Sequence, residues 1–209
     1  MPFTKTIARH ASLLILLLSL ILFFDACNND SGPRLLVFSK TKGFRHSSIP
    51  FANAGIYKLG VENGFAVDTT KDANMFTDET LKKYDAVVFA NTTGNVLNAK
   101  QQAAFERFIQ AGGGFVGIHS AADTEYEWPW YGKLAGAYFS SHPRNPGVRK
   151  AMVNVTDTSH LSTKGLPANW ERTDEWYNYK SIYNGIKVVA YLDENSYEGG
   201  TNGAEHPIA

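Results

Sequence analysis

Four short apolar runs, separated by helix-like segments, constrain the fold of this chain more than any other feature. The runs lie near residues 34–39, 65–69, 85–90 and 114–118, and each has about the length of one strand. Three of the runs are continuously apolar, and the second alternates between apolar and polar residues. Continuous apolar runs are typical of strands that are covered on both faces. The pattern predicts an α/β protein, a three-layer sandwich with a mostly parallel sheet.

Helix signals fill the intervals between these runs. Apolar residues recur at helical spacing over residues 49–63. Thr77 is placed to cap a short helix, and Asn98 to cap a longer one that Gly112 ends. The crossovers between parallel strands should be right-handed. The apolar residues expected on one face of the first helix are Phe51, Ile56, Leu59 and Val61.

The stretch Gly112–Asp123 indicates where a functional site lies on the sheet. It reads as a glycine-rich helix end, a buried strand and then His119 at a sharp strand-to-helix turn. Ligands bind at the carboxyl ends of parallel strands, and such a turn holds its apex side chain in the open. Histidine is the usual acid–base residue at neutral pH, so we expect His119 to be catalytic. A turn that carries histidine in place of a nucleophile does not by itself name a reaction.

Residues 1–27 resemble an export signal. A basic start precedes the apolar run Leu13–Phe24, which is shorter than the roughly 20 residues that span a bilayer. Cys27 follows the run, in the manner of a bacterial lipobox cysteine that is lipidated, with ordinary cleavage and an incidental cysteine as the alternative. We expect a periplasmic or cell-surface lipoprotein, held at the membrane only by its lipid, with residues 28–33 as a tether.

The composition of the chain limits the classes of partner that its domain, residues 34–209, is expected to bind. The full chain carries 20 basic and 20 acidic residues, with no basic stripe, which argues against nucleic-acid binding. Its single cysteine excludes an intrachain disulfide framework. The apolar fraction of 44% suits one domain with a core and favours no particular oligomeric state.

The second half of the domain is dense in aromatic residues and turns. The connection Asp123–Pro146 is long for a compact domain, and long connections are often functional. Strands are predicted at Met152–Val155 and Lys187–Leu192. Flat aromatic faces suit the C–H face of a sugar ring, although such residues also serve as core anchors. The candidates for sugar contact are Trp128, Tyr131 and Trp176, and Trp130 and Tyr177 offer similar flat faces.

Polar candidates join His119 at the same rim. Arg45 and His46 follow the first strand, and loops after parallel strands open on one side of the sheet. Arginine offers a fork of donors to sugar or carboxylate oxygens, and Asp174 and Glu175 offer acceptors to hydroxyls. For each of these four residues, the alternative is a structural hydrogen bond or a solvated surface charge.

No metal site and no cofactor are expected. The histidines of the domain are scattered singly, without the local pairs of familiar zinc sites. Gly112–Gly114 precedes a strand, whereas the glycines of a dinucleotide fingerprint follow one. Ser120 adjoins His119, but neighbouring residues on a turn point apart and no third orienting group is evident.

Several motifs together resemble the ThuA-like (trehalose utilisation) family. They are Phe38–Pro50, Gly113–Ala121, His160–Pro167, Asp174–Tyr177 and His206–Ala209. The resemblance implies a flavodoxin-like fold similar to class I glutamine amidotransferases. It also implies a small-molecule carbohydrate ligand, since the family is associated with disaccharide use through keto-sugar intermediates.

Two departures qualify what the resemblance implies. The amidotransferases carry cysteine where this chain and the ThuA-like family have His119, so cysteine-based glutamine hydrolysis is not implied. Family members usually continue past the His206–Ala209 motif, which predicts a C-terminally incomplete domain. Two hypotheses follow: an enzyme that uses acid–base chemistry on a disaccharide or keto-sugar, or a non-catalytic sugar- or partner-binding lipoprotein domain.

Overall fold

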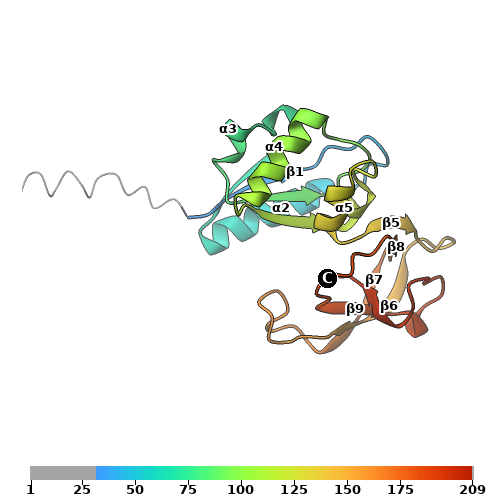
Figure 1. Ribbon diagram of the computed structural model, residues 1–209. Helices are drawn as coiled ribbons and strands as arrows, with labels where there is room; N and C mark the ends of the chain where they lie inside the picture. The colour runs from blue at the N-terminus through green and yellow to red at the C-terminus, as the bar shows by residue number, and fades with distance from the viewer. Residues whose placement is uncertain (1–31, 209) are drawn as a thin grey trace, which may run out of the picture. The chain divides into compact units, whose positions relative to one another are not determined.

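The computed structural model describes residues 32–208, which form an α/β protein with one parallel and two antiparallel sheets (Figure 1). The predicted signal segment and the lipidation candidate Cys27 lie outside the described residues. Among residues 32–208, no helix has both the length and the apolar character needed to span a membrane.

The parallel sheet contains the four predicted strands. They are β1 (Arg34–Phe38), β2 (Ala66–Thr70), β3 (Ala86–Ala90) and β4 (Gly114–Ile118), in the order β2-β1-β3-β4. Each lies within one residue of its predicted position. The predicted parallel pairing is confirmed for these strands.

The predicted helices and their caps are also present. Helices α2 (Ile49–Asn63), α3 (Asp78–Leu81) and α4 (Ala99–Gln110) connect the parallel strands. The Thr77 side chain accepts a hydrogen bond from the Thr80 backbone, and Asn98 forms a capping box with Gln101. Such caps satisfy backbone N–H groups that have no partner within the helix.

Apolar side chains pack on both faces of the parallel sheet because successive residues of a strand point to opposite sides. Phe38 and Phe89 belong to the larger core, where Phe89 stacks on Phe105 of α4 with ring centroids 5.4 Å apart. Val37 and Val88 belong to a smaller core on the other face, against which Ile56 of α2 packs. Figure 1 shows α2 and α4 on opposite sides of the sheet.

Helix α2 does not use the face that the sequence predicts. Its inward side includes Ile49, Ile56 and Gly60, spaced i, i+7 and i+11. A Cβ atom on Gly60 would lie 2.6 Å from the carbonyl oxygen of Phe65, so the glycine permits a close approach that larger residues forbid. The residues wrongly predicted to be inward, and found exposed, are Phe51, Leu59 and Val61.

The second half of the domain is antiparallel, so the prediction of a mostly parallel sheet holds for the first four strands alone. Met152–Val155 is a strand as predicted, but Lys187–Val189 precedes its strand. One sheet has the order β10-β9-β6-β7, and β5 pairs with β8 in another. The strands are β5 (Tyr138–Ser141), β6 (Arg149–Val155), β7 (Asn169–Asp174), β8 (Asn178–Lys180), β9 (Ala190–Asp193) and β10 (His206–Pro207).

Short helices complete the described part of the chain. The long aromatic connection contains α5 (Pro129–Ala135), which starts at a proline and ends at Gly136, φ 87°. Proline fits the first turn of a helix, and glycine tolerates the left-handed conformation that ends one. The 3-10 helices are η2 (Ala73–Met75), η3 (His119–Asp123), η4 (Glu194–Ser196) and η5 (Gly203–Glu205).

A buried carboxylate fixes the loop between β3 and α4. Glu125 is 1% exposed, and its Oε1 accepts hydrogen bonds from the backbone N–H groups of Val96 and Leu97, both at 2.7 Å. Its Oε2 accepts a third from Gln102 Nε2, also at 2.7 Å. Every hydrogen-bonding partner of this carboxylate lies between β3 and the first turns of α4, so Glu125 ties two distant segments together.

Candidate functional site

His119 stands at the turn between β4 and η3. Its backbone φ is 52°, in the left-handed region that few residues other than glycine adopt. Holding such a residue in that conformation costs about 1–3 kcal/mol, and the conformation persists only where the surroundings fix it. The turn therefore sets the direction of the His119 side chain at the carboxyl edge of the sheet.

Three side chains from separate parts of the chain meet at this turn. His119 Nε2 lies 3.1 Å from His46 Nε2 and 3.0 Å from Glu175 Oε2. His46 Nε2 lies 3.4 Å from the same Glu175 oxygen. His46 comes from the loop before α2, and Glu175 directly follows β7. We call these three residues the histidine–glutamate cluster.

Aromatic and hydroxyl side chains enclose the histidine–glutamate cluster. The ring centroid of the buried Tyr177 is 4.2 Å from that of His119, and its hydroxyl is 3.2 Å from His46 Nε2. Burial raises the pKa of Tyr177 well above its usual value, so the hydroxyl keeps its proton and can donate. Ser120 Oγ lies 3.3 Å from His46 Nδ1, so both nitrogens of that imidazole have polar neighbours.

The environment favours the neutral form of His119. Burial lowers the pKa of His119 below its usual value, and the nearby His46 lowers it further. The charges of Glu175 and Asp174 oppose this shift without cancelling it. At neutral pH the imidazole therefore keeps a lone pair, which can accept a proton or bind a cation.

A fourth polar side chain, that of His142, lies near the second carboxylate oxygen of Glu175. His142 Nε2 lies 3.6 Å from Glu175 Oε1, while His142 Nδ1 is 2.7 Å from the carbonyl oxygen of Pro143. Since a carbonyl only accepts, Nδ1 carries the hydrogen of that bond. Because His142 directly precedes Pro143, its place in the sequence predicts a structural residue of a turn.

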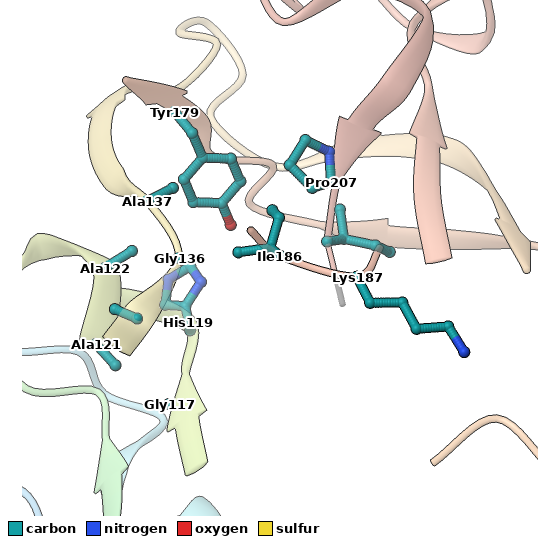
Figure 2. A pocket seen from close by; sticks show the side chains of 12 residues that line it. Gly117, His119, Ala121, Ala122, Gly136, Ala137, Tyr179, Ile186, Lys187 and Pro207 are labelled. Atoms are coloured by element: carbon teal, nitrogen blue, oxygen red, sulfur yellow. The ribbon is translucent and has the colours of Figure 1, made fainter. Parts of the chain in front are cut away.

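A pocket of about 280 Å³ opens beside His119 (Figure 2). Figure 2 shows the Tyr179 ring and the small side chains of Ala122 and Ala137 around it. Burial raises the pKa of Tyr179 to about 12, so its hydroxyl stays protonated at neutral pH. The wall includes His119, Ala122, Ala137, Tyr179, Ile186 and Pro207.

The structure brings some of the polar residues predicted for the site to His119 and places others away from it. His46 and Glu175 lie in the histidine–glutamate cluster with His119. Asp174 borders it, where one carboxylate oxygen accepts from the Glu175 backbone at 2.9 Å and the other pairs with Arg172. Arg45 is exposed and lines a separate surface hollow beside α2, so it is not among the groups that meet at His119.

Of the three aromatic residues predicted to contact sugar, Tyr131 and Trp176 are buried and Trp128 is partly buried. Tyr131 is 0% exposed, and its hydroxyl donates to the Ala121 carbonyl oxygen at 2.8 Å. Trp176 is 7% exposed and donates to the Arg149 carbonyl oxygen, while Trp128 packs against the larger core. Large aromatic rings stabilise the fold more when they are buried than when they are exposed to solvent. Tyr177, one of the flat faces that the sequence offers, lies against His119, and Tyr179 lines the pocket.

The histidine–glutamate cluster can also hold a metal ion. One ligand atom from each of its three residues lies within 4.8 Å of the other two. The expectation of no metal site rests on the absence of local histidine pairs. His46 and His119 are 73 residues apart, and Glu175 is 56 residues beyond His119, so no local spacing reveals this arrangement.

Comparisons with known proteins agree with this architecture. Residues 34–209 match the family model described as ThuA, trehalose utilisation. The crystal structure of a ThuA-like protein from Bacteroides uniformis ATCC 8492 is similar, with a TM-score of 0.70 and 28% identity over 84% of this chain and 75% of that one. A ThuA-like protein from Parabacteroides merdae ATCC 43184 shares the fold, with a TM-score of 0.64 and 19% identity over 84% and 73%. No curated protein matches the chain.

Proposed function

The chain belongs to the ThuA family, described as trehalose utilisation, and from this premise we propose that it is an enzyme acting on a disaccharide or keto-sugar. The family supplies the substrate class, and the residues around His119 supply the chemistry. We further infer that the parallel sheet and its helices form a flavodoxin-like three-layer sandwich, which the strand order β2-β1-β3-β4 supports.

One observation carries the enzymatic proposal. His119 lies in the wall of the pocket and is also 3.0 Å from Glu175. A histidine that contacts the ligand on one side and a carboxylate on the other can take up a proton and be stabilised as the cation that results. In the proposed reaction, His119 transfers a proton at the sugar and Glu175 orients and stabilises its imidazole.

The pocket suits part of a sugar. Small-molecule pockets usually measure about 300–1,000 Å³, so this one, at about 280 Å³, matches a single sugar ring better than a whole disaccharide. The Tyr179 hydroxyl is a donor for sugar oxygens, and the methyl groups of Ala122 and Ala137 offer apolar contact. The second ring of a disaccharide would extend towards solvent.

Filling the pocket tests where the sugar binds. Ala122→Phe is expected to raise KM for a disaccharide or keto-sugar at least about 10-fold, because the added ring occupies the space of the substrate. Steady-state kinetics measures KM, and Ala103→Phe on the exposed side of α4 is the matched control. An unchanged KM in Ala122→Phe, with the same melting temperature as the control, would place the substrate elsewhere.

We also infer that the protein is exported and anchored through Cys27, because the cysteine directly follows a basic and apolar leader. Expression with a labelled fatty acid should mark the wild-type chain and leave Cys27→Ser unmarked. Cell fractionation should move the protein from the membrane fraction to the soluble fraction in the same variant. Equal labelling of the two chains would exclude the anchor.

A further inference from the structure

We propose that His46, His119 and Glu175 bind one divalent transition-metal ion of the zinc class. The inference rests on the geometry of these side chains and does not depend on the proposed sugar chemistry; with an ion bound, His119 and Glu175 would be its ligands in place of the acid–base pair proposed above. Their side chains are 11%, 23% and 27% exposed. That exposure is low enough to weaken competition from water, yet an ion can still enter from solvent.

The distances between the ligand atoms are close to those around a tetrahedral ion, although two of them are also hydrogen-bond distances. Zinc binds imidazole nitrogen and carboxylate oxygen at about 2.0–2.1 Å, so two ligands of a tetrahedral ion are about 3.3–3.4 Å apart. The three separations are 3.1 Å (His46–His119), 3.0 Å (His119–Glu175) and 3.4 Å (His46–Glu175). Small side-chain adjustments of a few tenths of an ångström would complete the coordination.

One arrangement of the imidazole hydrogens is suited to a metal ion. A carboxylate only accepts, and a neutral imidazole has a single N–H. If His46 donates from Nδ1 to Ser120 Oγ, at 3.3 Å, its Nε2 bears a lone pair that faces the centre. His119 Nε2 faces the same point, 3.1 Å from His46 Nε2 and 3.0 Å from Glu175 Oε2. In the tautomer of His119 that carries its hydrogen on Nδ1, lone pairs of all three residues converge there, and a cation between them would remove their repulsion.

The surrounding groups resemble the outer shell of metal sites. Ligating histidines usually bond through their second nitrogen to another polar group, most often a carboxylate, a backbone carbonyl or water, which fixes the ring. Ser120 does this for His46, and His142 approaches the free oxygen of Glu175 at 3.6 Å. Tyr177 covers the face of the His119 ring and limits access of water from that side.

The ligand set indicates both the metal class and its use. Two imidazoles with one carboxylate suit zinc, and also iron(II), whereas calcium and magnesium prefer oxygen ligands. Three protein ligands leave a tetrahedral position free, as in catalytic rather than structural zinc sites. Because His119 also lines the pocket, the free position would adjoin the space that we assign to the sugar.

Direct metal binding tests the inference without any sugar. The full chain, stripped with a chelator, is titrated with Zn²⁺ by calorimetry, and with Co²⁺ while its visible spectrum is recorded. We expect one equivalent of either ion to bind, with an intense tetrahedral cobalt spectrum. Titration with Fe²⁺ under anaerobic conditions distinguishes the two candidate metals. Absence of saturable binding by all three ions would overturn the proposal.

Variants of the ligands locate the ion. His119→Ala and Glu175→Gln should each weaken Zn²⁺ binding more than about 100-fold, because even outer-shell partners contribute 10–100-fold. His160→Ala removes an exposed histidine that hydrogen-bonds to Ser162, and it should bind as the wild type does. Circular dichroism in chelator checks that each variant is folded, and His46→Gln offers a second, milder change. Wild-type affinity in folded Glu175→Gln and His46→Gln would place the ion elsewhere and refute the site.

Discussion

His119→Ala is expected to lower kcat/KM for the sugar substrate by at least about 1,000-fold while sugar affinity changes only a few fold. General acid–base residues contribute about 10²–10⁴-fold, and their loss removes transition-state stabilisation more than ground-state binding. A metal ion at the same centre would give the same result, because His119 would then be a ligand. The measurement combines steady-state kinetics on a panel of oxidised and unmodified disaccharides with calorimetric titration of the same sugars.

The control for this prediction is His160→Ala, which should keep wild-type activity. Turnover in His119→Ala within 10-fold of the wild type would exclude His119 as the reacting group. A wild-type chain that binds a sugar of the panel and never turns it over would support the alternative, a sugar-binding domain. In that event the metal titrations stand unaffected, because they contain no sugar.

Glu125→Leu is expected to reduce the free energy of unfolding by at least about 3 kcal/mol. The substitution leaves the N–H groups of Val96 and Leu97 without their acceptor, and each unsatisfied buried group costs about 1–3 kcal/mol. The Gln102 amide loses its partner as well. Chemical denaturation, read by circular dichroism, measures the change.

Two further variants separate the buried hydrogen bonds from a general effect of substitution. Glu125→Gln keeps one acceptor oxygen, and the Gln102 amide can rotate to accept from the new amide, so the loss should be about 1 kcal/mol. Glu127→Leu changes an exposed neighbour and should stay within about 0.5 kcal/mol of the wild type. Equal destabilisation by Glu125→Leu and Glu127→Leu would contradict the role assigned to Glu125.

The parallel sheet was predictable because its signals are local. Each of β1, β3 and β4 is an apolar run of strand length, and Thr77 and Asn98 mark helix starts by their own side chains. Strand β7 has no such signal: its residues, Asn169–Asp174, are mostly polar and mostly exposed. Its pairing with β6 depends on partners about 20 residues away, which a local pattern does not show.

The site was predictable in part for a similar reason. The strand end at His119 indicates a position on the sheet edge, and loops after parallel strands place His46 near it. Which aromatic residues reach the site depends on packing that the sequence does not express. Tyr131 and Tyr177 are equally aromatic, yet one packs in the core and the other faces His119. Glu175 meets His46 and His119 only because the antiparallel sheet forms, and no local pattern in the sequence predicts that sheet.

The position of Glu175 also affects when the site forms during folding and how it can open. It directly follows β7, the edge strand of its sheet, while His46 and His119 extend from the parallel strands. Contacts between residues far apart in sequence form late in folding, since a long loop must close first. Strand β7 is mostly exposed, and segments with few buried contacts open more readily than the core. Local opening of β7 would therefore withdraw the carboxylate and leave the parallel half folded, and a ligand held by all three residues would oppose that opening.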